Sequence, residues 1–448
     1  RQPRRRDTPA PVPMARLSRL AAGRAADHVV VRFAAGVSDW QGAQVAQGLG
    51  GGQARPARHG GFTRVAVPPG TTPEELVARL VAHPSVLWAE TDPLVRAAYR
   101  EVARADATAP TDPLYPLQWH LQRIGTEEAL ERNPTDGGGV LVAVIDSGIA
   151  YGEGTAFPRR PAPDLEGTAF APGRDFVDDD DEPFDEGTGD PDAPLTSPRF
   201  GHGTFAASVI AAQVDNGVAG ASVAPRVVLL PVRVLGPTGF GSTSDVAEGI
   251  RFAVERGAKV INLSLGATRG SNAIREAVAE AHRRGVLLVA AAGNEADEGL
   301  FDDELGRDVA FPARYPEVIA VGATDFADDR AAYSNFGPSL DVMAPGGDGL
   351  EVLEGGRRDG VLATSFLRDP RTGDTVYGAF WSTGTSFAAP QVAGLAALLV
   401  GLGVDDPDDV RRMIEGTTRD LGAEGEDETF GHGLADAAAA HRGLGFTF

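Results

Sequence analysis

The chain has 448 residues and a formal net charge of -22, with 41 Lys and Arg against 63 Asp and Glu. A chain of this length exceeds one ordinary core, so two domains are expected. The negative charge argues against nucleic acid as a partner, because phosphate would be repelled. The absence of cysteine excludes disulfides, thiolate chemistry and cysteine zinc sites. No run approaches the roughly 20 apolar residues of a membrane span.

The first part of the chain predicts a basic flexible tail over 1–27 and then a small ferredoxin-like α+β domain over 28–95. Three apolar runs predict strands at 28–33, 62–67 and 86–90. Thr72-Pro73-Glu74-Glu75 forms a capping box with proline in the first turn, so a helix is expected to begin there and to end before Pro84.

Residues 96–111 are small and polar without a period, which predicts an exposed linker open to proteolytic nicking. From residue 112 to 448 the chain alternates between apolar runs and amphipathic helices. Continuous apolar runs typical of strands covered on both faces lie at 140–145, 227–234, 260–265, 286–291 and 318–321. Helices are expected at 245–256 and 272–284. This alternation predicts a doubly wound, mostly parallel α/β sheet with catalytic groups at the carboxyl ends of its strands.

Ser386 precedes a long apolar run with helical periodicity, so it is expected at the N-terminus of a buried helix. The unpaired N–H groups of that first turn and the helix dipole suit an oxyanion held beside the serine. The other interpretation of Ser386 is a helix cap.

Three further residues suggest acyl-transfer chemistry around Ser386. Asp146 ends the run at 140–145, and His202 stands between two glycines at the start of an expected helix. A neutral imidazole can take the serine proton, and a buried carboxylate can orient that imidazole and stabilise its charge. Asn294 follows the run at 286–291, where its amide can donate to an oxyanion. Taken singly, Asp146 and Asn294 would be turn residues and His202 a structural histidine.

The chain order Asp146, His202, Ser386, with the motifs Val144-Ile145-Asp146-Ser147-Gly148, Gly201-His202-Gly203-Thr204 and Gly384-Thr385-Ser386, resembles the subtilisin-type serine proteases (the subtilase, or S8, family). The resemblance covers about 330 residues from Asp112 onward. It implies an endopeptidase that cleaves peptide bonds through an acyl-enzyme, with Asp146, His202 and Ser386 as the triad and Asn294 in the oxyanion hole. No cofactor is implied for catalysis.

The resemblance further implies that polypeptide substrates bind as extended strands, largely through main-chain hydrogen bonds. The residues it implies for substrate binding are Phe240, Gly241, Ser242, Ser264, Leu265, Gly266, Ala292, Gly293 and Glu295. Because Glu295 lies near the family's main specificity pocket, a basic residue before the scissile bond is expected alongside large apolar ones.

The N-terminal domain resembles the inhibitor-type (I9-like) propeptides of the same family. The chain is therefore expected to be a zymogen, with 87–95 as the strand left in the cleft and self-cleavage within 96–111. The propeptide would be an intramolecular inhibitor of a monomeric enzyme that is secreted or held at the cell envelope.

Two acidic sets resemble calcium ligands of the family. Asp175, Asp178 and Asp180 match a calcium loop, for which the alternative is a solvated acidic loop. Asp112, Asp164 and Asn216 match side-chain ligands of a second site.

Residues 346–381 are longer than the corresponding segment of compact family members, and 361–366 with 375–380 predict a hairpin. This insertion either shapes the rim of the cleft or has no role in binding. Two other functions stay open: a non-catalytic binding protein on the same fold, and an esterase that uses the same triad. The intact Asp146, His202, Asn294 and Ser386 argue against the binding protein.

Overall fold

The computed structural model describes residues 27–98, 102–104, 112–152, 161–189, 199–296, 308–351, 353 and 357–444, and for 102–104 it describes the backbone alone. The expected cleavage region 96–111 and the basic tail therefore lie largely outside the described residues.

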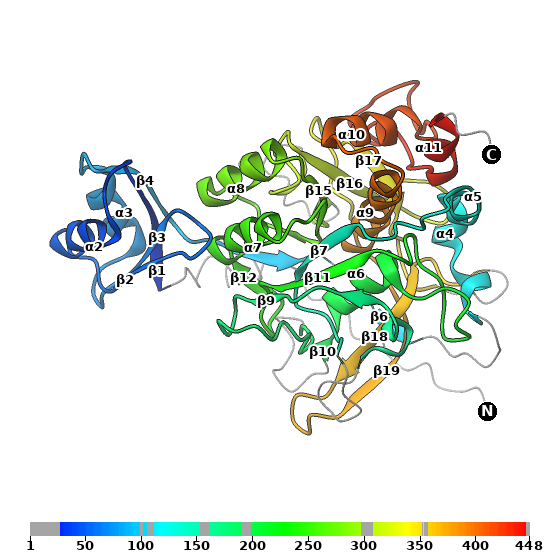
Figure 1. Ribbon diagram of the computed structural model, residues 1–448, viewed down its shortest axis with the longest axis horizontal. Coiled ribbons are helices and arrows are strands. Elements are labelled where there is room, and N and C mark those ends of the chain that lie inside the picture. Colours follow the sequence, from blue (N-terminus) through cyan, green and yellow to red (C-terminus); the bar gives the residue numbers. More distant parts are fainter. Residues whose placement is uncertain are drawn as a thin grey trace, which may run out of the picture.

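The N-terminal module is an antiparallel sheet covered by two helices, and it lies beside the larger domain near α7 and α8 (Figure 1). Its strands, in the spatial order β2-β3-β1-β4, are β2 (Ala54–Pro56), β3 (Thr63–Ala66), β1 (His28–Phe33) and β4 (Val86–Thr91). Helix α3 (Pro73–Val81) begins with the expected capping box of Thr72 and Glu75. Helix α2 (Asp39–Gly48) was not expected, because its buried positions are only Gly42 and Ala46 and give no clear apolar period.

The larger domain is built on a parallel sheet, which confirms the expected α/β fold. The strands run in the order β17 (Val342–Pro345), β16 (Val318–Thr324), β15 (Leu287–Ala291), β13 (Val260–Leu263), β7 (Leu141–Asp146), β11 (Val228–Arg233) and β8 (Ala169–Phe170), with β9 (Arg174–Asp175) also paired to β11. Because β7 is the first strand of this sheet along the chain and lies inside it, the strand order changes direction there, which is where sites of such sheets form.

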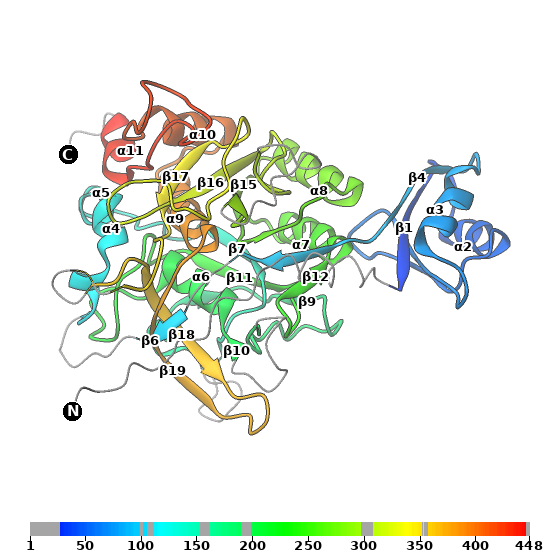
Figure 2. The ribbon, with the colours of Figure 1, turned by 180° about the vertical axis from the view of Figure 1, so that it is seen from behind.

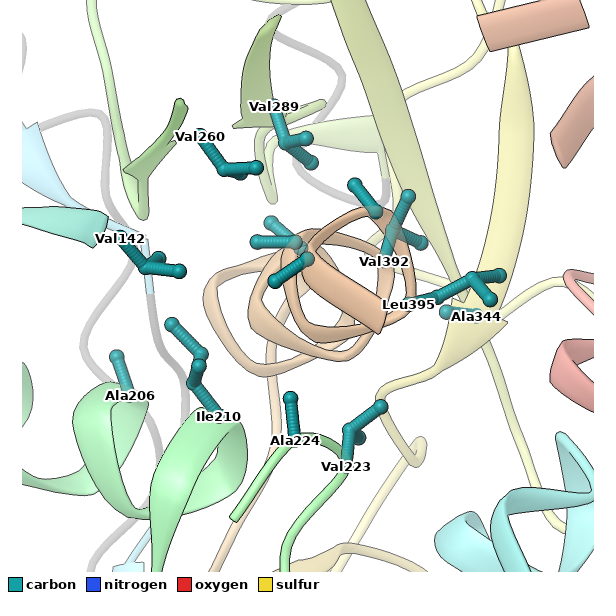
Figure 3. Close-up of a cluster of buried hydrophobic side chains, with 14 of the residues drawn as sticks. Val142, Ala206, Ile210, Val223, Ala224, Val260, Val289, Ala344, Val392 and Leu395 are labelled. Carbon is teal, nitrogen blue, oxygen red and sulfur yellow. The ribbon is translucent and has the colours of Figure 1, made fainter. Parts of the chain in front are cut away.

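Helices cover both faces of this sheet. One apolar cluster joins α6 (His202–Ala211) and α9 (Thr385–Gly401) to alternate sheet residues, including Val142, Val260 and Val289. Figure 3 shows these side chains around α9, which is apolar on all sides because it is enclosed by the sheet, by α6 and by Val223 and Ala224.

The opposite face packs on α7 (Thr243–Glu255) and α8 (Asn272–Arg283). In the part of the chain that the structure describes, the remaining helices are α4 (Trp119–Arg123), α5 (Thr126–Arg132), α10 (Pro407–Gly416), α11 (Ala437–Gly443) and the 3-10 turns η2 (Tyr115–Leu117) and η3 (Pro163–Leu165). No helix among the described residues has the length and apolar character needed to cross a bilayer.

Two small sheets attach to this framework. In the first, β5 (Leu94–Ala97) lies between β12 (Phe240–Ser242) and β14 (Leu265–Gly266). In the second, the order is β10 (Arg199–Phe200), β18 (Val361–Arg368), β19 (Thr375–Ser382) and β6 (Val102–Arg104). The predicted hairpin is thus β18–β19, two residues longer in each strand than expected, and it projects from the domain in both ribbon views (Figure 2).

Candidate active site

Asp146 and His202 meet where β7 ends and α6 begins. Asp146 is the last residue of β7, His202 is the first residue of α6, and both are fully buried. His202 Nδ1 and Asp146 Oδ1 are 2.7 Å apart, and Asp146 Oδ1 also accepts a hydrogen bond from Ser147 N–H at 2.6 Å. Gly203 permits this approach, because a Cβ there would lie 2.2 Å from the Gly148 carbonyl oxygen. The pair therefore depends on close packing of α6 against the end of β7.

Asp185 contacts both Ser147, next to Asp146, and Thr204, in the first turn of α6, and it was not identified from the sequence. It is fully buried and accepts hydrogen bonds from Ser147 Oγ, Gly187 N–H, Thr204 N–H and Thr204 Oγ1, at 2.7–3.1 Å. Burial raises the pKa of Asp185 to about 6. Nothing in the run of acids before Asp185 distinguishes it as the buried one, so only packing reveals it.

Ser386 occupies the second position of α9 and is fully buried. Its Oγ donates to the Ser264 carbonyl oxygen at 2.9 Å and accepts from Ala98 N–H at 2.9 Å. The ring of Phe387, the next residue, lies 5.3 Å from the ring of His202 between centroids. The structure thus brings the starts of α9 and α6 together.

Asn294 follows β15 and faces the start of α9. Its Oδ1 accepts from Thr385 N–H at 3.0 Å and from Thr385 Oγ1 at 2.8 Å. These two bonds fix the amide so that Nδ2 lies on the side away from Thr385. Ser386 N–H donates to the Ala98 carbonyl oxygen at 3.1 Å, so a peptide carbonyl already lies at this helix terminus.

The chain after the N-terminal module crosses this site as an extended strand. β5 pairs antiparallel with β12, where Arg96 faces Phe240, and with β14, where Ala97 faces Leu265. Ala98 N–H donates to the Ser264 carbonyl oxygen at 3.4 Å, which extends the second ladder to Ser386. The expected strands 240–242 and 264–266 therefore enclose a segment of the chain itself.

Two expectations about this segment need correction. The strand at 87–95 was expected in the cleft, but β4 (Val86–Thr91) pairs with β1 in the module, and the cleft strand is Leu94–Ala97. Pro93 separates the two strands because it lacks an N–H group for a ladder. The linker was also expected to be exposed from residue 96, yet Ala98 is only 5% exposed.

Glu295 forms an ion pair with Arg96, two residues before Ala98. Burial alone would raise the pKa of Glu295, but the charge of Arg96 and hydrogen bonds, including one from Asn335, hold it below its usual range. Asn335, missed in the sequence, donates from Nδ2 to Glu295 Oε2 at 2.7 Å and accepts from Glu295 N–H at 2.8 Å. Gly293 has a φ of 104°, and a Cβ there would come within 2.4 Å of Asn335 Nδ2.

The module contacts the larger domain through two carboxylates at helix N-termini. Glu90 accepts from Asn272 N–H at 2.9 Å and Ala273 N–H at 3.1 Å in the first turn of α8. Asp92 accepts from Ser244 N–H at 3.0 Å in the first turn of α7. Both carboxylates satisfy N–H groups that have no partner within the helix and lie at its positive end.

The first acidic set does not fit a cation. Arg233 Nη1 lies 2.6 Å from both Asp175 Oδ2 and Asp178 Oδ2, so a guanidinium occupies the place a metal would take. The Asp180 carboxylate instead accepts from Glu182 N–H at 2.8 Å. Among the described parts of the chain, no group of three or more His, Asp or Glu side chains has the arrangement of a metal site.

The second set does converge. Asn216 Nδ2 donates to Asp164 Oδ1 at 2.9 Å, and Asn216 N–H donates to Asp112 Oδ1 at 3.1 Å. Burial, and to a smaller extent the charge of Asp112, raises the pKa of Asp164 to about 7 although hydrogen bonds lower it. The two nearby buried carboxylates suit calcium, whereas the Asn216 amide turns Nδ2 to Asp164 and its Oδ1 accepts from Val218 N–H at 2.7 Å.

Comparison with known proteins shows which family this chain resembles. Residues 137–433 match the family described as "Subtilase family". The chain is 34% identical over 353 residues to "Thermophilic serine proteinase" of Bacillus sp. (strain AK1), covering 79% of this chain and 72% of the relative. It is also 34% identical over 330 residues to "Subtilisin Savinase" of Lederbergia lenta, covering 73% of this chain and 99% of the relative.

Two solved structures are similar. A protease from Pseudoalteromonas arctica has a TM-score of 0.62 and 32% identity, covering 75% of this chain and 99% of that chain. Fervidolysin from Fervidobacterium pennivorans, described as a keratinolytic enzyme related to subtilisin, has a TM-score of 0.69 and 22% identity, covering 93% of this chain and 61% of that chain. The second likeness speaks for the fold alone.

Proposed function

Because the chain belongs to the subtilase family and is a subtilisin-type serine protease, we propose that it is an endopeptidase that acts through an acyl-enzyme on Ser386 and that the chain as written is its propeptide-inhibited precursor. The observation that carries the proposal is the path of β5, which presents the chain's own Ala98 to Ser386 between two strands of the larger domain.

In the proposed mechanism His202 takes the proton of Ser386 Oγ as the hydroxyl attacks a peptide carbonyl, and later gives it to the departing amine. Asp146, 2.7 Å from His202 Nδ1, holds the imidazole in the useful tautomer and stabilises its positive charge. The backbone N–H of Ser386 and the side-chain amide of Asn294 stabilise the oxyanion. Water then hydrolyses the acyl-enzyme by the same proton transfers.

The position of Ala98 indicates the bond that the precursor cleaves in itself. Its carbonyl oxygen accepts from Ser386 N–H, which is one of the two donors to the oxyanion. The scissile bond is therefore the one between Ala98 and Tyr99. Arg96 occupies the third position before this bond, so Glu295 selects a basic side chain there rather than directly before the cleavage site.

The inhibitor role of residues 28–95 is supported by their contacts with α7 and α8. The carboxylates of Glu90 and Asp92 end on the first turns of these helices, and β5 fills the cleft behind them. A docked module that leaves its last strand in the site blocks other substrates until it is removed. We expect the enzyme to act as a monomer that is secreted or held at the cell envelope. Inhibition by the docked module would protect the proteins of the producing cell until the enzyme has left it.

Catalysis in this scheme needs no cofactor, and calcium has a structural role. Asp112, Asp164 and Asn216 would hold it, and the ion would neutralise carboxylates that are otherwise buried close together. We do not extend this role to Asp175, Asp178 and Asp180, since Arg233 already neutralises the first two.

The test is the mass of the purified protein. We expect the wild-type chain to yield a form beginning at Tyr99, and Ser386→Ala to stay uncut. Asn294→Ala should process more slowly by about 10²–10³-fold, the cost measured when a subtilisin loses this donor. Ser38→Ala, at an exposed helix cap of the module, is the matched serine control and should process normally.

A Ser386→Ala chain that still appears cut at Tyr99 without added protease would refute self-processing. Labelling of the wild type by a fluorophosphonate, absent from Ser386→Ala, identifies the nucleophile. Parallel casein and short-chain ester assays then separate an endopeptidase from an esterase, because only the endopeptidase degrades casein.

A further inference from the structure

The insertion hairpin pairs with the chain on the far side of the expected cleavage site. β6 (Val102–Arg104) adds antiparallel to β19, with Val102 facing Ser382, Ala103 facing Trp381 and Arg104 facing Phe380. Among the described residues, β6 is the strand that ends this sheet beyond β19. The edge of β19 therefore accepts an extended segment four to six residues after Ala98.

The register links this edge to the nucleophile. Ala98 contacts Ser386, and four residues later Val102 faces Ser382, which stands four residues before Ser386. The two separations are equal, so the pairing of Val102 with Ser382 keeps the antiparallel register that the contact of Ala98 with Ser386 sets. A polypeptide that leaves the site in this direction meets the β19 edge at its fourth residue.

The hairpin is fixed firmly enough to serve as a template. Phe380 packs with Phe200, Phe205 and Phe387 on one face of β19, whereas Trp381 packs in a different cluster on the other face. The partner strand β18 is tied to the start of α6, since Gly201 N–H donates to the Phe366 carbonyl oxygen at 3.1 Å. Gly201 directly precedes His202, so the hairpin and the catalytic groups share one rigid frame.

The outer part of β19, residues 375–379, extends the exposed edge of this strand away from the domain. Beyond Phe380, β19 continues through Ala379 to Thr375 opposite β18, and Val376 is 47% exposed. Among the described residues no strand pairs with this part of β19 on the side away from β18, and such an edge is the arrangement that binds an added strand.

We propose that the edge of β19 is a substrate-binding site for the part of a polypeptide that follows the scissile bond, from its fourth residue onward. Binding is by strand addition, in the register that β6 shows in the precursor. The proposal rests on the proposed cleavage after Ala98, because that bond sets the count of residues. It makes the enzyme favour long, unfolded polypeptides over short peptides, with little demand on their side chains beyond the cleft.

The test compares internally quenched peptides of the chain's own sequence, cut by the wild-type chain after it has processed itself. The first peptide spans 94–101 and ends three residues after the bond, whereas the second spans 94–106. A net hydrogen bond corresponds to several-fold in affinity, so two or three added bonds should raise kcat/KM for the longer peptide on the order of tenfold.

N-methylation of the longer peptide gives a control that is specific to strand addition. In an antiparallel pair only alternate residues direct their N–H groups to the partner strand. Methylation at 102 and 104 and methylation at 103 should therefore differ, with one pattern removing the gain and the other retaining it.

Equal kcat/KM for the two peptides would overturn the proposal, and so would equal effects of the two methylation patterns. The two peptides would be cut at equal rates if β6, which belongs to the new N-terminal segment after self-cleavage, stays paired with β19. Cleavage of the 94–101 peptide after Ala98 tests the cleft separately, so a failure of β19 is distinguishable from a failure of the active site. If neither peptide is cut, both the cleft assignment and this inference fail.

Discussion

Replacing Asp92 by alanine should loosen the N-terminal module from the larger domain. The Asp92 side chain is 1% exposed and accepts hydrogen bonds from Thr243 Oγ1 at 2.7 Å, Ser244 N–H at 3.0 Å and Ser244 Oγ. A hydrogen bond to a charged group contributes about 1.5–3 kcal/mol, and the first turn of α7 would lose an anion at its positive end. Counting the bonds to Thr243 and Ser244 as two such contributions gives about 3–6 kcal/mol.

This loss corresponds to an opening equilibrium of the module raised by about 10²–10⁴-fold. The assay is hydrogen exchange at the amides of β5 in full-length Ser386→Ala, where processing is blocked. Asp39→Ala is the matched control, because Asp39 is an exposed first-turn acid of α2 on the same module. Amides of β1 report whether the module itself stays folded. Unchanged exchange of β5 in Asp92→Ala, or an equal change in Asp39→Ala, would refute the role of Asp92.

Three other changes test the electrostatics of the chain. Burial would lower the pKa of His28, but the hydrogen bond at 2.7 Å and the charge of Asp92 raise it, so the folded module binds the proton more tightly. The stability that this pair gives the folded module should be fully present below about pH 6.5 and should decline as the pH rises through the raised pKa of His28. Hydrogen exchange of the β1 amides measures this dependence, which should be absent in His28→Gln. Asp185→Asn places an amide N–H donor against the hydroxyl and N–H donors that Asp185 now accepts from. The substitution should lower kcat by about tenfold or more with KM little changed. An unchanged kcat would show that Asp185 does not position His202. Melting temperature should be higher in calcium than in chelator, and Asp164→Asn should remove the difference; equal melting temperatures in the wild type would exclude the site.

Much of the framework was predictable because local patterns and the tertiary structure agree. The buried strands of the parallel sheet are continuous apolar runs, and α8 begins at its serine cap, Ser271, as expected. Asp146, His202 and Ser386 could be proposed as a triad because each has a marked local position, Asp146 at the end of β7 and the other two at the starts of α6 and α9. β17 and α2 were missed because a four-residue strand and a weakly apolar helix carry little periodic signal.

The buried polar contacts around the site join residues that are distant in sequence. Asn335 meets Glu295 only because the loop after β16 returns to the end of β15, and Asp185 is selected from its acidic neighbours only by burial. The sequence alone determined the fold class, and it led to the proposed reacting groups because parallel strands bring their ends to one edge of a sheet. Tertiary structure decided that the cleft strand is Leu94–Ala97, that Arg233 neutralises Asp175 and Asp178, and that the insertion pairs with residues 102–104, because main-chain pairing and charge compensation between remote segments leave no periodic mark in the chain.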